Sequence, residues 1–459
     1  MAERFEIVEK ALLAMLEDKK YSTLRDILAT MNPSDIAAVF TGMEYREIIL
    51  MYRLLPKELA AETFVEMEPD DQEALIKSFS DAELKEVLAE LYVDDAADIV
   101  EEMPANVVKR ILKHADPEMR SSINQILRYP ENSAGSIMTT EYVSLRPNMT
   151  VEEAILRIRR QGVDKETIYT CYVTAKDRTL IGMTTVKDLL LAADDEMTIE
   201  EIMFTNLIFV NTQTDQEEVA RMFSKYDFLA MPVVDGEGRM VGIVTFDDAM
   251  DVMEEEATED MELMSGMTPS EKPYLRSTPF DLFKNRIPWL MLMMVSATFT
   301  GLIMTAFEDA LAAQIALSAF IPMLMGTGGN SGSQSSVTVI RGLSLGELKF
   351  RDIGTVLWKE IRTALMCGIA LAVVCFVKIW LVDHLLFGNN DITLMVDLVV
   401  CLALAVTVVV AKMVGCMLPI GAKAINLDPA VMASPFISTI VDALSLLVYF
   451  MFAKMLLNI

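Results

Sequence analysis

A single carboxylate stands inside a long apolar stretch near the end of the chain. Asp442 lies near the middle of residues 430–457, a run long enough to cross a bilayer. A charged side chain at that depth is costly, and such residues usually mark an ion or proton path. The sequence therefore predicts an ion path at Asp442. The alternative is a buried Asp that is hydrogen-bonded to a neighbouring helix.

The residues that lead to Asp442 supply further oxygen ligands. Asp428 and Pro429 are expected to cap the start of this helix. Ser434 and Pro435 are expected to interrupt it about one turn later, which frees backbone carbonyls. Carbonyls and one carboxylate per chain, doubled by two-fold symmetry, suit a hydrated hard cation. Mg²⁺ sheds water reluctantly and therefore needs few protein ligands.

An earlier apolar segment, residues 321–343, is dense in glycine, serine, asparagine and glutamine. Small residues allow helices to pack closely, which is the simpler explanation for them. Polar side chains exposed to lipid at this depth would be expensive, so their density favours a water-accessible path. The predicted pore-lining residues are Gly328, Gly329, Asn330 and Gln334.

Charge divides the chain into two halves. The 459 residues carry a formal charge of −28, of which −27 falls in residues 1–286, while hydrophobic residues make up 53% of the chain. An acidic half of this size argues against nucleic acid as a partner, because phosphates would be repelled. It suits cations, and the alternative is a surface that serves solubility. With two histidines and no C-x-x-C pair, the chain favours hard, oxygen-preferring cations such as Mg²⁺ over softer metals.

The elements that must position these residues fall into four predicted parts. Residues 1–130 show helical periodicity, with three similar segments that suggest a small superhelix. Residues 131–253 contain a duplicated β-α-β-β-α pattern in which each half ends with Thr-x-x-Asp, and this resembles a pair of CBS domains. Residues 254–286 form a connecting helix and linker. Residues 287–459 form an α-helical transmembrane domain.

Five apolar segments are predicted to span the membrane. They cover residues 287–307, 312–340, 354–382, 394–418 and 430–457. Lys and Arg gather before the first span, after the second and after the fourth, whereas the other loops are acidic. The positive-inside rule then predicts a multi-pass protein of the inner (plasma) membrane, with a cytoplasmic N-terminus and the C-terminus outside.

The two polar membrane segments and the order of the domains resemble the MgtE family of magnesium channels over the whole chain. The resemblance rests on P-x-x-x-G-T-G-G-N-x-G-x-Q from Pro322 and on D-P-A…P…D from Asp428 to Asp442. It implies a homodimer in membrane lipid whose pore lies between the subunits. Asp442 is similar to the pore aspartate, Asp428 to an acidic residue at the cytoplasmic mouth, and Ser434 stands where some relatives carry Asn.

The resemblance also implies a use for the acidic half. Cytosolic Mg²⁺ is expected to bridge carboxylates between the N domain, the CBS pair and the connecting helix, and thereby to close the pore. For any one carboxylate, a solvated surface position is the alternative. The residues similar to sensor positions are Glu62, Asp94, Asp98, Asp215, Glu217, Asp227, Asp248, Asp251, Glu256, Glu259 and Asp260.

The Thr-x-x-Asp pairs indicate a second ligand. In CBS pairs this Asp commonly binds a nucleotide ribose, and some members of the family bind ATP there. The positions that fit are Thr185, Asp188, Thr245 and Asp248. Because Asp248 is also a predicted sensor ligand, ATP binding is the weaker hypothesis.

No catalytic constellation emerges: the chain carries no P-loop and no suggested nucleophile–base pair, so we do not expect an enzyme. The prediction is passive Mg²⁺ uptake, closed by Mg²⁺ bound to the acidic half. One alternative is an exporter of divalent cations that works by ion exchange. Another is a membrane-anchored sensor of nucleotide or Mg²⁺.

Overall fold

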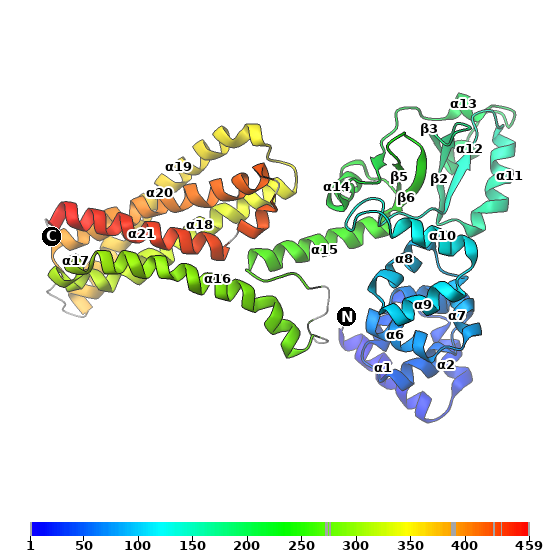
Figure 1. Cartoon of the computed structure of the whole chain (residues 1–459), viewed down its shortest axis with the longest axis horizontal. Helices are drawn as coiled ribbons and strands as arrows, with labels where there is room; N and C mark the ends of the chain where they lie inside the picture. Colours follow the sequence, from blue (N-terminus) through cyan, green and yellow to red (C-terminus); the bar gives the residue numbers. More distant parts are fainter. Residues whose placement is uncertain are drawn as a thin grey trace. The chain divides into compact units, whose positions relative to one another are not determined.

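The computed structural model describes residues 2–270, 274, 277–386, 392–425, 427–432 and 434–457, without the side chains of residues 2–6, 164 and 434. It divides into two compact units, which we call the first unit (Met1–Met253) and the second unit (Glu254–Ile459). The boundary falls inside one continuous helix, α15 (Phe246–Met264). Figure 1 shows the helices and strands of both units.

The first unit begins with a purely helical N domain. Its helices are short because proline or a capping box starts several of them, as Ser80 and Glu83 do at α7. Helices of this length are unstable alone and depend on packing of their apolar faces. They are α1 (Ala2–Glu17), α2 (Tyr21–Leu28), α3 (Pro33–Phe40), α4 (Tyr45–Tyr52), α5 (Lys57–Val65), α6 (Pro69–Ser78), α7 (Asp81–Leu88), α8 (Val93–Glu102), α9 (Ala105–His114) and α10 (Pro117–Ile126).

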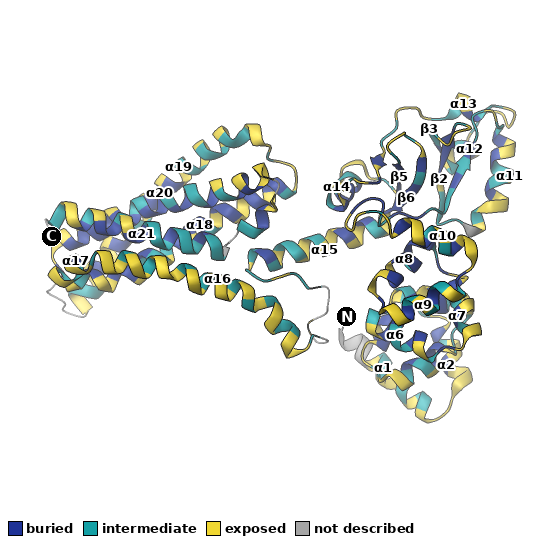
Figure 2. Cartoon of the chain, viewed as in Figure 1, coloured by how far each residue is buried: buried dark blue, intermediate teal, exposed yellow. Residues whose placement is uncertain are grey.

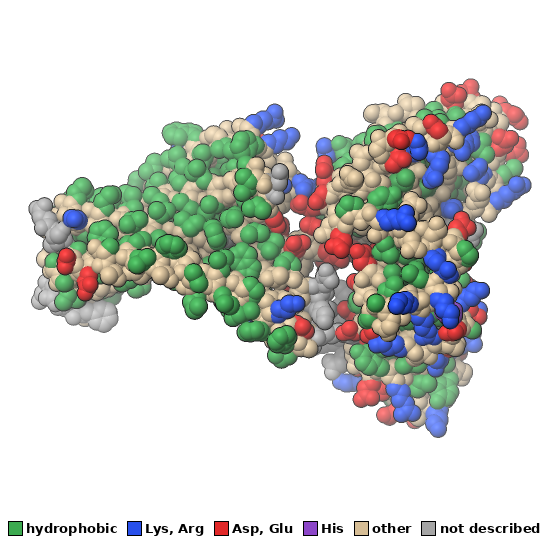
Figure 3. Space-filling view, viewed as in Figure 1, with side chains coloured by type: hydrophobic (Ala, Val, Ile, Leu, Met, Phe, Trp, Pro, Cys, Tyr) green, Lys and Arg blue, Asp and Glu red, His purple; other side chains and the backbone are tan. Residues whose placement is uncertain are grey.

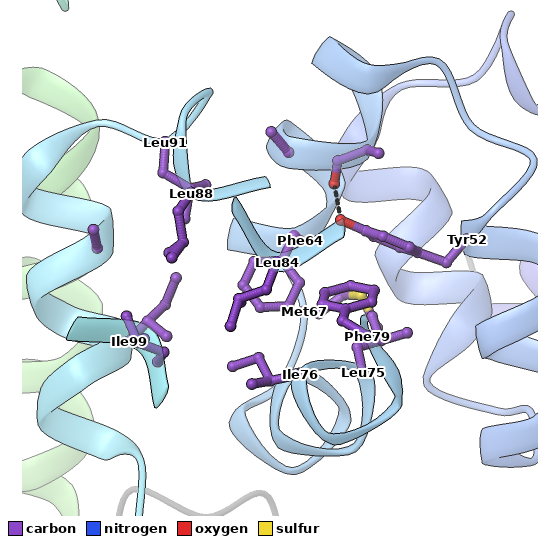
Figure 4. Packing of buried hydrophobic residues seen from close by; sticks show 14 of the residues in the cluster. Tyr52, Phe64, Met67, Leu75, Ile76, Phe79, Leu84, Leu88, Leu91 and Ile99 are labelled. Atoms are coloured by element: carbon purple, nitrogen blue, oxygen red, sulfur yellow. Dashed lines mark hydrogen bonds between the residues drawn. The ribbon is translucent and has the colours of Figure 1, made fainter. Parts of the chain in front are cut away.

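Alternate helices of the N domain stack on one another, α1 on α3, α3 on α5, α5 on α7 and α7 on α9. The three similar segments found in the sequence are α3, α5 and α8. A continuous apolar core runs through the stack, with the rings of Tyr52, Phe64 and Phe79 in contact (Figure 4). The buried Tyr52 hydroxyl donates to the carbonyl of Ala60 at 2.9 Å. The predicted all-α N domain is confirmed.

The CBS pair follows as two three-stranded sheets with the same topology. In each sheet the first strand is parallel to the second, and the second is antiparallel to the third. The tips of the two hairpins pair with each other, since Leu180 donates to Gly238 and Met240 donates to Arg178. The predicted duplication is confirmed. The strands are β1 (Tyr142–Leu145), β2 (Thr167–Thr174), β3 (Leu180–Thr185), β4 (Val210–Asn211), β5 (Ala230–Val234) and β6 (Met240–Thr245).

Helices cover these sheets and bury two separate apolar cores, one for each repeat. Capping boxes start α11, α12 and α13, so the polar residues that precede each helix fix where it begins. The helices are α11 (Val151–Gln161), the 3₁₀ turn η1 (Gly162–Asp164), α12 (Val186–Leu190), α13 (Ile199–Ile202), α14 (Gln216–Tyr226) and the first part of α15.

All regular secondary structure among the described residues of the second unit is helical, and apolar side chains cover much of its visible face (Figure 3). Its elements are α16 (Pro279–Ala306), α17 (Glu308–Ala313), η2 (Ile315–Phe320), α18 (Ile321–Ser344), η3 (Phe350–Asp352), α19 (Ile353–Lys378), the π-helical η4 (Ile379–Leu386), α20 (Leu394–Ala424), η5 (Pro429–Met432) and α21 (Ser434–Leu457).

Helix α18 lies against both α20 and α21, α19 packs on α20, and α16 packs on α21. No residue of α16 is buried within the chain (Figure 2). Within the part of the chain that the structure describes, four helices are long and apolar enough to cross a membrane: Pro279–Ala306, Phe350–Leu386, Leu394–Ala424 and Pro429–Leu457. The predicted second span falls on η2 and α18. Helix α18 has 24 residues, but many of them are polar, and it is not among these four helices. The count of five spans therefore stays a prediction.

Candidate ion path and cation-sensing cluster

Asp442 lies on α21 beside the residues of that helix that meet α18. Ser438 and Ser445, which lie four residues before and three residues after it, share its helical face. A Cβ added at Gly329 would lie 3.3 Å from the Ser438 hydroxyl, and one added at Gly328 would lie 2.7 Å from that of Ser445. Asp442 itself is half-buried. Asp442 therefore lies at the edge of the contact between α18 and α21, where it is partly exposed.

The two faces of α18 differ in burial and in the kind of residue that they carry. Gly328 and Gly329 are buried and allow the backbone of α18 to approach α20 and α21 closely. Asn330 and Gln334, one turn apart, are exposed on the other face, followed by Thr338. Of the predicted pore-lining residues, the glycines therefore serve helix packing within the chain, whereas the two amides form an exposed polar stripe.

The start of the last membrane segment is interrupted, as the sequence predicts. The 3₁₀ turn η5 precedes α21, and Pro435 occupies the first turn of that helix. Asp428 is exposed, and its carboxylate caps η5 by accepting from the Ala430 amide at 2.8 Å. The side chain of Ser434 lies outside the described residues.

A second group of carboxylates gathers in the first unit, between the N domain and the CBS pair. Asp94, Glu141 and Glu166 each offer one oxygen, and these oxygens lie within 4.8 Å of one another. Asp94 is buried, and its Oδ1 atom has no hydrogen-bond partner among the described residues, as is true of Glu166 Oε2. Orphaned buried oxygens of this kind are costly. A set of carboxylate oxygens is also what Mg²⁺ and other hard cations bind, so the residues fit such an ion.

Burial and mutual repulsion make these carboxyl groups hard to ionise. Burial, with help from the charge of Asp248, raises the pKa of Asp94 well above its usual range. The same two causes raise the pKa of Asp95 to about 7 and that of Asp98 to about 8. For Glu166, burial and the charge of Asp95 raise the pKa to about 8. A divalent cation or protons would relieve this repulsion.

The chain positions this cluster through local geometry. Asp94, Asp95 and Asp98 lie on α8, and Glu141 fixes the start of that helix by accepting from the Val93 amide at 3.2 Å. Glu141 and Glu166 immediately precede β1 and β2, which are parallel neighbours, so their positions meet at one edge of the sheet. The Glu166 amide also donates to the Glu141 carbonyl.

Sequence reasoning found Asp94, Asp98 and Asp248 in this cluster but missed Asp95, Glu141 and Glu166. The position of a carboxylate just before a strand was the available signal for Glu141 and Glu166. The sequence pattern does not reveal which strands pair, and the parallel pairing of β1 with β2 joins positions that are far apart in the sequence.

The other predicted sensor residues are spread over several elements. Glu62, Asp215, Asp227 and Asp251 are exposed. Asp215 caps α14 by accepting from the Glu217 amide, and Glu217 pairs with Arg221 at 2.8 Å. In the second unit, Asp260 accepts from the Ser344 hydroxyl at 3.4 Å. Glu256 and Glu259 lie on the same helix, α15, and are partly exposed.

The Thr-x-x-Asp pairs have a clear local role. The Asp188 carboxylate accepts from the Thr185 amide, and the Thr185 hydroxyl accepts from the Asp188 amide, which caps α12. The Asp248 carboxylate likewise accepts from the amide and hydroxyl of Thr245 at the start of α15. Burial raises the pKa of Asp248 to about 6 although these bonds from Thr245 oppose the shift.

Comparison with known proteins explains this combination of parts. Family models match the MgtE intracellular N domain at residues 31–132, two CBS domains at 134–195 and 199–255, and a divalent cation transporter domain at 321–452. The magnesium transporter MgtE of Thermus thermophilus is 36% identical over 98% of both chains. The chain belongs to the MgtE family of magnesium transporters. It is not a member of an enzyme family.

Other relatives agree with this assignment. The magnesium transporter MgtE of Bacillus subtilis is 32% identical over 96% of this chain and 95% of its own length. A crystal structure of the cytosolic domain of the Mg²⁺ channel MgtE in complex with ATP matches 53% of this chain and 99% of its own, at 39% identity and a TM-score of 0.51. The soluble part of a magnesium transporter matches 55% and 99%, at 30% identity and the same TM-score. Family membership and four long apolar helices make this a membrane protein.

Proposed function

We propose that the chain is a Mg²⁺ channel that mediates passive uptake along an ion path lined by α18 and α21. The observation that carries this proposal is the half-buried Asp442, which lies in an otherwise apolar helix beside the residues of α21 that meet α18. One carboxylate can hold a hydrated Mg²⁺ ion without stripping its water. An inside-negative potential would drive entry, at about 2.3 kcal/mol per charge per 100 mV.

The polar stripe on α18 supports a homodimer with the path between two copies. Asn330 and Gln334 are exposed in the single chain at a depth where contact with lipid tails would be expensive. A second copy placed against this stripe would cover it and would leave a polar space between the subunits. Cysteines introduced at Asn330 should cross-link two chains under mild oxidation, whereas cysteines at the exposed Leu447 should not.

Closure by Mg²⁺ would act through the acidic cluster of the first unit. The carboxylates of Asp94, Glu141 and Glu166 are near enough to share one cation, and Asp95, Asp98 and Asp248 repel them while the cation is absent. An ion bound there would favour the arrangement that holds the N domain against the CBS pair. The proposed orientation places this unit in the cytoplasm and the C-terminus outside.

The decisive experiment is Mg²⁺ uptake into proteoliposomes under an inside-negative potential. Uptake should occur with the unmodified chain and should fall at least about tenfold with Asp442→Asn, because the ion loses its charged partner. Glu347→Gln, at an exposed carboxylate of the second unit, is the matched control. Equal flux through the Asp442→Asn variant would overturn the assignment of the path.

Regulation is tested in the same vesicles by adding Mg²⁺ to the side that carries the first unit. The unmodified chain should be inhibited, and the Asp94→Asn/Glu166→Gln variant should need at least about ten times more Mg²⁺ for the same inhibition. Na⁺-dependent flux would favour the exporter instead. Absence of flux in both the unmodified chain and its variants would favour the membrane-anchored sensor.

We further propose that ATP binds the CBS pair at the Thr185–Asp188 half. A relative in this family was crystallised with ATP, and Asp188 is partly exposed at the start of α12. Asp248 is less suited, because its charge lies near the acidic residues Asp94, Asp95 and Asp98 of α8.

A further inference from the structure

A lysine that is not among the residues assigned to the path is buried within the apolar bundle of the second unit. Lys412 of α20 is only 5% exposed. At 1.5 Å per residue it lies roughly 16 Å along the helix axis from Lys423, near the end of the same helix. A buried ammonium at membrane depth needs a counter-charge, and such residues are functional by default.

The counter-charge comes from α19 through a hydroxyl of α18. Lys412 Nζ donates to Ser335 Oγ at 3.2 Å, and Ser335 Oγ donates to Glu360 Oε2 at 2.7 Å. The Ser335 hydroxyl is 2% exposed, and it uses one lone pair and its single proton in these two bonds. Three helices therefore meet at one hydroxyl, and the two charges compensate each other across it.

The position of this triad relates it to the proposed path. Gly332, one turn before Ser335, lies against Ala411 of α20 and against Ile437 and Val441 of α21. Ser335 is therefore within one turn of the part of α18 that packs beside Asp442. In the middle of α18 the buried surface consists of glycines and serines, whose small side chains restrict rotation of the helix little, whereas Leu324 and Leu343 pack nearer its two ends.

We propose that Lys412, Ser335 and Glu360 form an intramembrane clamp that fixes the rotation of α18 and so keeps Asn330 and Gln334 directed at the ion path. The three are positioning residues, and the proposal rests on the proposed path along α18 and α21. Removal of Glu360 leaves the ammonium of Lys412 buried without compensation, and removal of Lys412 leaves the partly exposed carboxylate of Glu360 without its counter-charge. Removal of both leaves a neutral site that the bundle tolerates.

Flux measurements in proteoliposomes separate the clamp from ordinary packing. Lys412→Met and Glu360→Gln should each reduce Mg²⁺ uptake about tenfold or more, and the double variant should recover to within about threefold of the unmodified chain. Lys423→Met, at an exposed lysine of the same helix, should leave uptake within twofold. Losses that simply add in the double variant would overturn the clamp.

Rotation is measured directly with single cysteines in a chain whose five native cysteines are replaced. Asn330 is exposed and the adjacent Ser331 is 7% exposed, so Asn330→Cys should react with a small cationic thiol reagent far faster than Ser331→Cys. Adding Ser335→Ala, which keeps both charges and removes only the bridging hydroxyl, should lower this ratio of rates by about tenfold.

The same readout distinguishes the two proposals from each other. A cysteine at Asn330 that never reacts in the otherwise unmodified chain would refute the ion path itself. A cysteine that reacts there, with a ratio of rates unchanged by Ser335→Ala, by Lys412→Met and by Glu360→Gln, would refute the clamp alone.

Discussion

The carboxyl groups of Asp94 and Glu166 lie within 4.8 Å of each other, although one comes from α8 of the N domain and the other from the residue before β2. Each has an oxygen without a hydrogen-bond partner among the described residues. Such a pair can be neutralised by a divalent cation or by protons, and pH therefore competes with Mg²⁺ at this site.

The first prediction concerns stability against pH in the absence of divalent cations. Burial and neighbouring charge raise the pKa of Asp98 and of Glu166 to about 8, whereas unfolded carboxyl groups titrate near 4. Between these two pKa values the folded state holds more protons than the unfolded state. The contribution of these groups to the free energy of unfolding is therefore fully present below about pH 4 and is lost as pH rises through 8. Each extra proton corresponds to about 1.4 kcal/mol per pH unit.

Thermal unfolding of the first unit within the purified chain should accordingly show a lower midpoint at pH 8.5 than at pH 6 in chelator. Saturating Mg²⁺ should reduce this difference, because the cation replaces the protons. Glu166→Gln should flatten the dependence, and Glu152→Gln, an exposed carboxylate of α11, should not. A midpoint of thermal unfolding that rises with pH in the presence of chelator would contradict the repulsion among these buried carboxylates.

A second prediction concerns the junction of α6 with α9. The Arg110 guanidinium donates to the carbonyls of Ile76 and Phe79 at the end of α6, which the helix itself cannot satisfy, and contacts Asp81 at 3.3 Å. Arg110→Met keeps the apolar stem but leaves these carbonyls unpaired. It should lower the free energy of unfolding of the N domain by about 2 kcal/mol, measured in urea. Lys109→Met, next to it but exposed, should change it by less than about 0.5 kcal/mol.

A third prediction tests the close approach of α18 and α20. A Cβ added at Gly415 would lie 2.1 Å from the backbone carbonyl oxygen of Gly332, so Gly415→Ala must push the two helices apart. The expected cost is about 1–3 kcal/mol, seen as a lower unfolding midpoint in detergent. Gly421→Ala, in the same helix but with open space around it, should instead stabilise by about 0.5–1 kcal/mol. Equal effects of the two substitutions would show that α18 and α20 are further apart.

A fourth prediction addresses the nucleotide. Asp188→Asn retains an oxygen that can cap α12, so the helix should lose only a few tenths of a kcal/mol. It removes the charged acceptor for the ribose, and the Kd for ATP should rise about tenfold in calorimetric titration. Asp248→Asn should alter the response to Mg²⁺ and leave the Kd for ATP within about threefold. A Kd for ATP that rises with Asp248→Asn and not with Asp188→Asn would assign the nucleotide to the other half of the CBS pair.

Sequence patterns predicted most of the architecture because helical periodicity, the duplicated strands and long apolar runs are local signals. The same signals led to Asp442 and to the interruption before α21. They failed where tertiary pairing decides the outcome. Glu141 and Glu166 meet only because β1 and β2 are parallel neighbours. The role of Ser335 depends on which side of α18 meets α19 and α20, and the run of serines gives no such preference.

The glycine contact between α18 and α20 has a consequence for how this bundle assembles. Apolar burial gives no driving force between helices in lipid, because lipid tails are equally apolar. Helix association therefore depends on van der Waals contact and on the conformational entropy that the side chains lose in making it. Gly332 and Gly415 meet backbone to backbone and have no rotamers to lose. At this one contact the two helices therefore meet without a cost in side-chain entropy.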